Sequence, residues 1–177
     1  YGATKMLLEK LVLEAARTNI TAQYTVARYG NVLGTRGSVL PHWQELRRQG
    51  KTLPITDPDM TRFFFTLDDA LALLDFSLAQ RTGIVVSQAM KAATLGDMVA
   101  VMSGPAGVLV SGPRLGEKQH EELLTGEEMA RTTQWENFLL YDPAQRAVVH
   151  RAKPAYTSDT APRLTREELA ILLKEYL

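Results

Sequence analysis

Hydrophobic and polar positions along the chain follow the helix period in some segments and the strand period in others. Residues 2–16 (GATKMLLEKLVLEAA) repeat apolar side chains at the i, i+3, i+4, i+7 spacing of one helix face. Residues 23–29 (QYTVARY) are rich in strand-forming residues and lead into a Gly-Asn pair, which predicts a strand. A helix that leads into a short apolar strand indicates an α/β fold.

The remaining segments continue this mixture of short helices and strands. Further helices are predicted at residues 41–49, 67–80, 94–102 and, from a Thr165–Glu168 capping box onward, 165–176. Short strands are predicted within residues 51–66 and at 83–87, 107–110 and 138–141. The segments between them predict a loop at 31–38, a turn at 112–114, an acidic helical piece after residue 117 and a hairpin around 143–150.

Composition excludes several classes of protein. Of the 177 residues, 45% are hydrophobic and 23% are charged, as in ordinary globular proteins. The 20 basic and 20 acidic side chains balance, so no nucleic-acid partner is expected. Because the chain has no cysteine and its histidines (His42, His120 and His150) are scattered, neither a disulfide framework nor a metal site is predicted. It has no run of 18 apolar residues and no signal pattern, so we expect a cytoplasmic protein without a membrane span.

Tyr1 and Lys5 form the first candidate for chemistry. They lie four residues apart on the first helix, so their side chains share a face, and an ammonium near a phenol favours the phenolate. Such a tyrosine can take a proton from an alcohol while a hydride leaves the same carbon. The alternative interpretation of this pair is an exposed helix N-terminus without chemistry.

Three later segments carry groups that suit a phosphorylated ligand. Residues 28–41 (RYGNVLGTRGSVLP) put glycines and an asparagine at the C-terminal end of a strand, where open α/β sheets bind ligands. Arg62 lies in an otherwise apolar stretch and Arg114 lies in a glycine-flanked turn. The two guanidinium groups could converge on a diphosphate through bidentate hydrogen bonds. A tight turn and two surface ion pairs are the structural alternatives.

Taken in order, the strings YGATK, RYGNVLGTRGSVLP, ITDPDMTRFFF and GPRLGEKQHE resemble the nucleotide-sugar branch of the extended short-chain dehydrogenase/reductases. Within that branch, the chain is most similar to the polysaccharide-biosynthesis family of inverting UDP-N-acetylglucosamine 4,6-dehydratases. The similarity runs from Tyr1 to about Asp142 and returns weakly at residues 156–159 (YTSD). It implies an α/β fold that is the C-terminal part of a Rossmann-like, doubly wound parallel sheet with a small α+β substrate-binding subdomain.

The resemblance also implies roles for individual residues. Tyr1 and Lys5 match the family's catalytic tyrosine and lysine. The implied cofactor-binding residues are Tyr1, Lys5, Tyr29, Gly30 and Asn31. The implied substrate-binding residues are Asn31, Arg36, Val39, Leu40, Arg62, Arg114 and Glu117. In this set the arginines at 62 and 114 would grip the phosphates, the loop from 36 to 40 would cover the nucleotide, and the glutamate would meet the uridine ribose.

The implied reaction begins with oxidation at carbon 4 of UDP-N-acetylglucosamine, when Tyr1 takes the hydroxyl proton and NADP, or NAD, accepts the hydride. Oxidation acidifies the proton on carbon 5, and its removal expels water from carbon 6. The returning hydride then leaves a 4-keto-6-deoxy sugar for surface polysaccharide or glycan biosynthesis. The family resemblance further implies a homo-oligomer, and we expect the helix at residues 2–16 to form the interface.

One part of the family pattern is missing. A dinucleotide site needs a glycine-rich turn after the first strand, and no such fingerprint occurs in the 177 residues. Because the chain opens on Tyr1 inside a helical pattern, we expect a cofactor-binding segment upstream and no activity from the chain alone. Residues 1–50 would then complete the Rossmann-like domain, and residues 51–177 would mainly form the substrate subdomain, with some strands returning to the main sheet. The alternatives are a UDP-sugar epimerase or reductase of the same superfamily, and a non-catalytic nucleotide-sugar-binding or oligomerisation module.

Overall fold

The structure, a computed structural model, describes residues 2–35, 37–103, 107–145 and 153–177. The contacts divide the chain into two compact units. The first unit comprises Tyr1–Tyr29, Leu67–Ala89 and Glu122–Tyr156, and the second comprises Gly30–Thr66, Met90–Glu121 and Thr157–Leu177. Residues 30–50 thus group with the second unit, and the segments Leu67–Ala89 and Glu122–Tyr156 return to the first.

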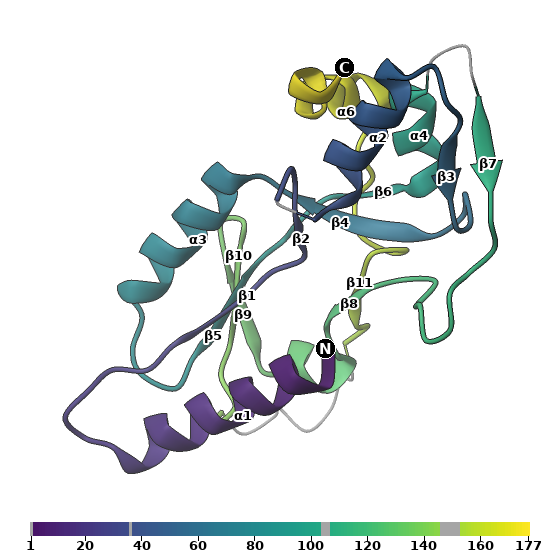
Figure 1. Ribbon diagram of the computed structural model, residues 1–177. Helices are drawn as coiled ribbons and strands as arrows, with labels where there is room; N and C mark the ends of the chain where they lie inside the picture. The colour runs from purple at the N-terminus through teal and green to yellow at the C-terminus, as the bar shows by residue number, and fades with distance from the viewer. Residues whose placement is uncertain (1, 36, 104–106, 146–152) are drawn as a thin grey trace. The chain divides into compact units, whose positions relative to one another are not determined.

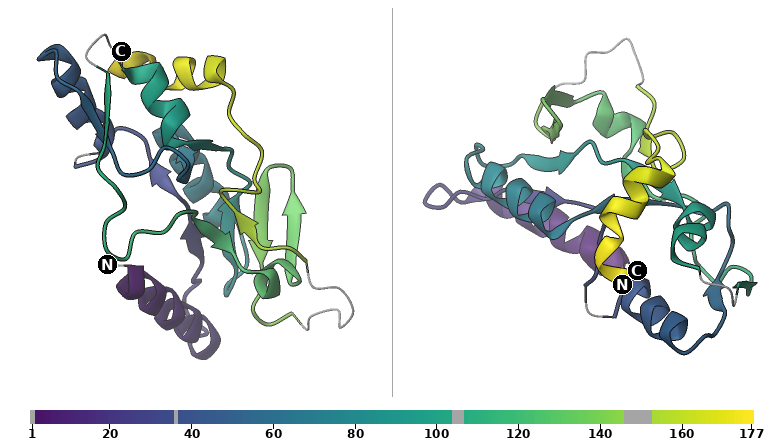
Figure 2. Two further views of the ribbon diagram at one scale, coloured as in Figure 1. Left: turned by 90° about the vertical axis from the view of Figure 1, so that its right-hand side faces the viewer. Right: turned by 90° about the horizontal axis from the view of Figure 1, so that it is seen from above.

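The first unit is built on a four-stranded sheet in the order β1-β5-β10-β9. Strands β1 (Val26–Arg28) and β5 (Val85–Gln88) are parallel. Helix α3 (Leu67–Leu78) precedes β5 and contacts both strands, as a crossover helix does (Figure 1). Strand β10 (Phe138–Tyr141) runs antiparallel to β5 and forms a hairpin with β9 (Thr132–Trp135), which the left view of Figure 2 shows in light green.

Helix α1 (Gly2–Thr18) also belongs to the first unit and contacts β1. The core beneath these elements is formed by Val85, Leu124, Leu139 and Tyr141. Strand β8 (Glu122–Leu124) and the short helix α5 (Gly126–Met129) follow one another in this unit. Strand β11 (Tyr156–Thr157) lies where the chain passes from the first unit to the second.

In its described residues, the second unit contains two small sheets. Strand β4 (Thr61–Phe65) is central in the order β2-β4-β6, parallel to β2 (Asn31–Val32) and antiparallel to β6 (Ala92–Thr94). Strand β3 (Leu53–Ile55) pairs in parallel with β7 (Val108–Val110).

Among the described residues, three helices and a final turn complete the second unit. They are α2 (Val39–Arg48), α4 (Leu95–Met102), α6 (Arg166–Leu172) and the 3-10 turn η1 (Lys174–Tyr176). These helices gather near the C-terminus in Figure 1. They enclose a core formed by Leu40, Trp43, Leu53, Ile55, Met98, Val99, Met102 and Leu173.

The α/β fold predicted from the sequence is confirmed, and most helices lie where the pattern puts them. The first helix continues to Thr18, and the capping box before α6 is present. The region 51–66 forms two strands instead of one, and the predicted loop at 31–38 opens with β2. The acidic helical piece expected after residue 117 is the four-residue helix α5, which strand β8 precedes.

The hairpin predicted around residues 143–150 falls mostly outside the described residues, and the hairpin that the structure contains joins β9 to β10. Within the described ranges, no helix combines the length and the apolar character needed to cross a lipid bilayer.

Candidate functional site

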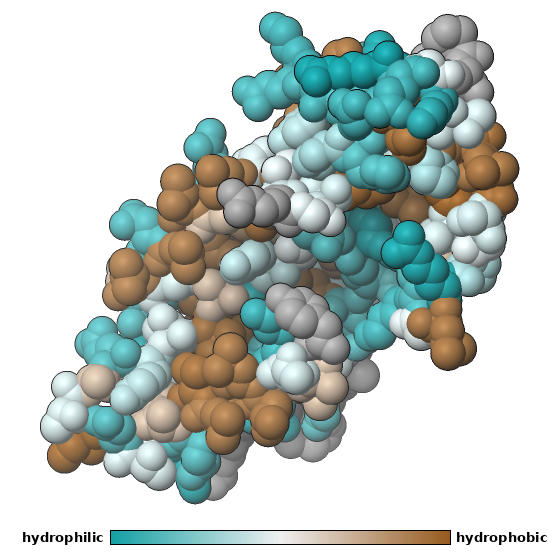
Figure 3. Space-filling view, viewed as in Figure 1, coloured by the Kyte–Doolittle hydropathy of each residue, from teal (hydrophilic) through white to brown (hydrophobic). Residues whose placement is uncertain are grey.

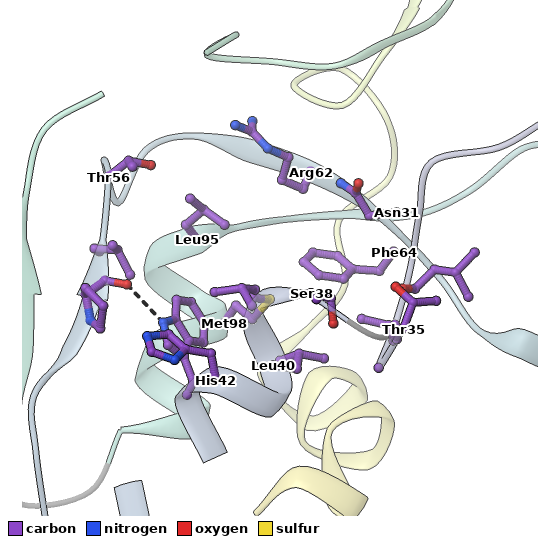
Figure 4. Close-up of a pocket in the computed structure, with 18 of the residues that line it drawn as sticks. Asn31, Thr35, Ser38, Leu40, His42, Thr56, Arg62, Phe64, Leu95 and Met98 are labelled. Atoms are coloured by element: carbon purple, nitrogen blue, oxygen red, sulfur yellow. Dashed lines mark hydrogen bonds between the residues drawn. The ribbon is translucent and has the colours of Figure 1, made fainter. Parts of the chain in front are cut away.

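The second unit contains a cavity of about 490 Å³. It is bounded by the loop that leads into α2, by β3 and β4, by α4 and by the segment around residues 114–117 (Figure 4). Six of the residues predicted to bind substrate line this cavity: Asn31, Val39, Leu40, Arg62, Arg114 and Glu117. The sequence segments that carry them lie far apart in the chain, and the fold of the second unit brings them together.

Strand geometry explains why Arg62 faces the cavity. Residues in β4 alternate between buried and partly exposed positions, so Phe63 and Phe65 enter the core while Arg62 and Phe64 share the other face. The parallel register sets Asn31 of β2 opposite Phe64. Figure 4 shows Asn31, Arg62 and Phe64 along the same side of the cavity.

The loop after β2 is held against the end of the chain. The Leu33 N–H donates to the carbonyl of Phe65 at 2.8 Å, which extends the β2–β4 pairing. Gly34 has a φ of 69°, and a Cβ atom at this position would lie 1.6 Å from the hydroxyl oxygen of Tyr176. Only glycine combines this backbone conformation with the close approach of the tyrosine. Arg36, predicted to cover the nucleotide, lies outside the described residues.

Ser38 is a residue of the cavity that the sequence did not single out. It lines the cavity and precedes α2 in the N-cap position, yet its side chain makes no cap hydrogen bond. Its hydroxyl oxygen is buried and has no hydrogen-bond partner among the described residues. A buried hydroxyl is usually paired, so this group could serve a ligand in the cavity.

Arg62 is engaged by its neighbours in this structure. Its Nη1 donates to the carbonyl oxygens of Thr61 at 2.8 Å and Gln119 at 3.2 Å. Its Nη2 lies 3.3 Å from Oε1 of Glu117, and its side chain is only 14% exposed. The same carboxylate accepts the backbone N–H of Arg114 at 3.1 Å, so Glu117 links the two arginines predicted to bind phosphate.

A second carboxylate, from Glu121, lies beside the same strand. It accepts a hydrogen bond from Nδ2 of Asn31 at 2.8 Å and another from the Phe63 N–H at 2.9 Å. The backbone N–H of Glu121 donates to the hydroxyl of Ser158, which is fully buried. Sequence reasoning missed both residues, although Glu121 is the last residue of the GPRLGEKQHE segment and Ser158 belongs to the YTSD segment.

The residues predicted to act on the sugar and cofactor belong mostly to the first unit. Tyr1 lies outside the described residues. Lys5 is exposed on α1, and Tyr29 is 46% exposed after β1. Gly30 belongs to the second unit, where a Cβ atom would lie 2.8 Å from Cβ of Phe63, so packing alone requires glycine at this position.

Arg28 anchors the end of β1 in the first unit. It pairs with Glu9 of α1 at 2.6 Å and with Glu128 of α5 at 2.8 Å, and it donates to the carbonyl of Leu123. Burial alone would lower the pKa of Arg28, but hydrogen bonds from its guanidinium to Glu128 and Glu9 raise it above the usual value. Burial would likewise raise the pKa of Glu128, but the Arg28 and Thr125 hydrogen bonds hold it below its usual range.

The family model for polysaccharide biosynthesis proteins matches residues 1–143. The chain belongs to this family. It is 36% identical over 155 residues to the UDP-N-acetylglucosamine 4,6-dehydratase (inverting) of Campylobacter jejuni subsp. jejuni serotype O:23/36 (strain 81-176), covering 84% of this chain and 46% of that protein. It is 33% identical over 190 residues to the UDP-glucose 4-epimerase of Rickettsia bellii (strain OSU 85-389), covering 97% of this chain and 56% of that protein.

Among solved structures, the X-ray structure of Pen from Bacillus thuringiensis matches this member of the polysaccharide biosynthesis family with a TM-score of 0.88 and 28% identity. The match covers 99% of this chain and 57% of that one. The chain thus spans about half the length of the curated relatives it matches. The family predicted from the four ordered motifs is confirmed.

A dinucleotide site needs groups that the residues of this family member do not all provide. The exposed ammonium of Lys5 suits the hydroxyl groups of a nicotinamide ribose, but the chain has no glycine-rich turn for a pyrophosphate. In the part of the chain that the structure describes, no group of three or more histidine or acidic side chains is arranged to hold a metal ion.

Proposed function

We propose that this chain is the substrate-binding part of a nucleotide-sugar dehydratase that converts UDP-N-acetylglucosamine to a 4-keto-6-deoxy sugar. The observation that carries the proposal is the cavity of the second unit, which gathers Arg62, Arg114, Asn31 and Glu117 around one space. Two guanidinium groups and a buried hydroxyl that line one cavity match the charge and hydrogen-bonding needs of a diphosphate. The similarity to the Campylobacter jejuni dehydratase supports the choice of substrate.

Binding of the diphosphate requires an exchange of partners at Arg62. Its contact with Glu117 has the geometry of a charge-assisted pair, and a phosphate oxygen carries the same type of acceptor. We propose that the diphosphate takes the place of the Glu117 carboxylate on the guanidinium. The carboxylate is then released to accept hydrogen bonds from ribose hydroxyl groups, the role that the resemblance implies for it.

The proposed chemistry depends on Tyr1 and Lys5. The Tyr1 phenolate accepts the proton of the sugar hydroxyl at carbon 4, and the Lys5 ammonium on the same helix face stabilises the phenolate. A nicotinamide cofactor, which we propose to be NADP with NAD as the alternative, supplies reversible hydride acceptance when bound. A dinucleotide-binding segment joined to this chain would provide the pyrophosphate site.

The binding step is testable with the 177-residue chain itself. Isothermal titration calorimetry should show binding of UDP and UDP-N-acetylglucosamine, with weaker binding of uridine, which lacks the diphosphate. Arg114→Ala should weaken UDP binding about tenfold or more because a charge-assisted contact is lost. The matched control is Arg48→Ala, because Arg48 is exposed at the end of α2 and outside the cavity lining. Absence of UDP binding by the unaltered chain would contradict the proposal.

The catalytic step is tested on a polypeptide in which a dinucleotide-binding segment precedes Tyr1. Mass spectrometry of the sugar nucleotide should show loss of one water molecule, and Tyr1→Phe should abolish this while leaving substrate binding intact. The similarity to the Rickettsia bellii epimerase supports a second candidate, a UDP-sugar epimerase, whose product keeps the mass of the substrate. Turnover by the Tyr1→Phe protein would contradict the assignment of Tyr1 as the base.

The reading frame upstream of Tyr1 separates the enzyme from a non-catalytic nucleotide-sugar-binding or oligomerisation module. An in-frame glycine-rich fingerprint there supports the enzyme, whereas an initiator Met directly before Tyr1 supports the module.

We also propose a homo-oligomer whose contacts involve α1, because Met6, Leu7, Leu8 and Leu11 are all more than half exposed on it. A cytoplasmic location stays a prediction.

A further inference from the structure

We propose that Glu121 is a positioning residue of the nucleotide-sugar site, which fixes the side-chain amide of Asn31 and the strand that carries Arg62. This inference rests on the proposed function, because it concerns the same cavity. Glu121 does not line the cavity itself, so it would act on a ligand through its two neighbours.

The carboxylate of Glu121 joins two strands of the second unit. Its Oε1 accepts from Asn31 Nδ2 in β2 at 2.8 Å, and its Oε2 accepts from the Phe63 N–H in β4 at 2.9 Å. The same Oε1 lies 3.9 Å from Nε of Arg62. One side chain therefore holds an amide, a strand backbone and a guanidinium at the edge of the cavity.

The contact also decides which way the Asn31 amide faces. An ionised carboxylate has no hydrogen to donate, so only the NH₂ side of the amide can point toward Glu121. The amide oxygen must then face away from Glu121, and the second N–H keeps a fixed direction. Asn31 lines the cavity, so the pattern of donor and acceptor that it presents there is set by Glu121.

Glu121 is itself held by a buried network. Its N–H donates to the Ser158 hydroxyl and its carbonyl accepts from the Ser158 N–H, each at 2.8 Å. The Ser158 hydroxyl lies 2.7 Å from the hydroxyl of Thr61, which precedes Arg62. Ser158 is fully buried and Thr61 is 1% exposed, so the backbone that carries the carboxylate has little freedom. This arrangement suits a residue whose task is to orient others.

The negative charge of Glu121 lies beside a cavity that we propose to bind an anion, so two possible roles of this residue predict opposite changes in affinity. If Glu121 acted on a diphosphate only through its charge, removing that charge would reduce repulsion and strengthen binding. If Glu121 positions Asn31 and Arg62, removing the charge disturbs the donor pattern and weakens binding. The sign of the change in affinity therefore separates the two roles.

Glu121→Gln provides the first test, with UDP titrated calorimetrically into the 177-residue chain. We expect UDP affinity to fall about tenfold, with circular dichroism unchanged. Glu121→Asp keeps the charge but shortens the side chain, so it should also weaken UDP binding. The matched control is Glu122→Gln, because Glu122 is the exposed neighbour and should leave UDP affinity unchanged. UDP affinity that is unchanged or higher in Glu121→Gln overturns the proposal.

A double-mutant cycle with Asn31→Ala tests the pathway of the effect. Once the amide is gone, Glu121→Gln should reduce UDP affinity much less than it does in the unaltered chain, because the residue it orients is absent. Fully additive losses would contradict positioning through Asn31.

A readout without ligand keeps this inference separate from the proposed function. The side-chain amide protons of Asn31, followed by NMR, should exchange with water more slowly in the unaltered chain than in Glu121→Asp. A chain that binds neither UDP nor UDP-N-acetylglucosamine contradicts the proposed function. An Asn31 amide that exchanges equally fast in both proteins overturns the positioning role.

Discussion

A serine and three threonines occupy the N-cap positions before α2, α4, α5 and α6. Thr94, Thr125 and Thr165 each accept a hydrogen bond from the backbone N–H three residues later. Ser38 makes no such bond before α2, and its buried hydroxyl lacks a partner among the described residues. Since a buried unpaired hydroxyl costs free energy, a ligand that pairs with it gains more than a new contact on an exposed surface would give.

Ser38→Ala should therefore separate affinity from stability. We expect UDP affinity to fall about fivefold, because one buried hydrogen bond to the ligand is lost. The free energy of unfolding should not decrease, because no cap bond is removed. Calorimetry with UDP and urea denaturation measure the two quantities. Thr94→Ala is the control at a cap that does form, and it should lower stability by about 1 kcal/mol. Equal UDP affinity of Ser38→Ala and the unaltered chain would contradict a ligand role for Ser38.

At the scale of elements, Arg28 joins three parts of the first unit. It links β1 to α1 through Glu9 and to α5 through Glu128, and the three side chains are only 12–21% exposed. Glu9 follows Tyr1 and Lys5 at successive intervals of four residues, so all three share one face of the helical pattern. The ion pair with Arg28 thus fixes the rotation of α1, the helix that carries Lys5.

Arg28→Met should lower the free energy of unfolding by about 2 kcal/mol at neutral pH, because two largely buried carboxylates lose their cation. The unaltered chain should lose stability as pH falls below about 4. The pKa of Glu128 is lowered in the folded chain, so protonation of its carboxylate at low pH removes the stabilisation that pairing with Arg28 provides. In Arg28→Met, burial without a cation raises the pKa of this carboxyl, so stability should rise as pH falls. Urea denaturation at several pH values measures both trends.

The control for this prediction is Arg17→Met, which removes an exposed ion pair with Glu14 from the same helix. It should change stability little and leave the pH dependence as it is. If the Arg28→Met protein kept the pH dependence of the unaltered chain, Arg28 would not govern the ionisation of Glu128.

Elements with local signals were predictable from the sequence. The capping box of α6 and the apolar spacing of α1 depend on neighbours within a few residues, and both helices form as predicted. Strand β2 was missed because its two residues become a strand only by pairing with β4, far along the chain. The β9–β10 turn was missed because Glu136 adopts a φ of 52°, a conformation for which glutamate gives no sequence signal.

Some residues of the candidate site were predictable from local motifs, and others were identified only from the fold. Motif order was sufficient to select Asn31, Arg62, Arg114 and Glu117, which line one cavity. The roles proposed for Ser38 and Glu121 depend instead on what lies opposite them in space. A local sequence pattern does not reveal that Ser38 makes no cap hydrogen bond. It also does not reveal that the Glu121 carboxylate accepts a hydrogen bond from Asn31 of another segment.

At the scale of the whole molecule, the chain passes repeatedly between its two units, so neither unit is a continuous segment. The residues proposed to bind substrate that line the cavity belong to the second unit, whereas Lys5 belongs to the first. None of the described residues in α1 is buried, and Figure 3 shows hydrophobic side chains gathered over this helix. Four apolar side chains of α1 are 54–64% exposed: Met6, Leu7, Leu8 and Leu11. Their exposure favours burial of this face against another polypeptide surface.

The double substitution Leu7→Lys with Leu11→Lys tests whether this face joins copies of the chain. The two leucines are one helical turn apart, so two ammonium groups would oppose burial of the same stripe. Lysine is a good helix former, so circular dichroism should show that α1 persists. Light scattering after size exclusion should show an oligomer for the unaltered chain and a monomer for the variant. Ile171→Lys, at a residue 74% exposed on α6, should leave the oligomer intact. A monomeric unaltered chain, or a variant with the same mass as the unaltered oligomer, would contradict assembly through α1.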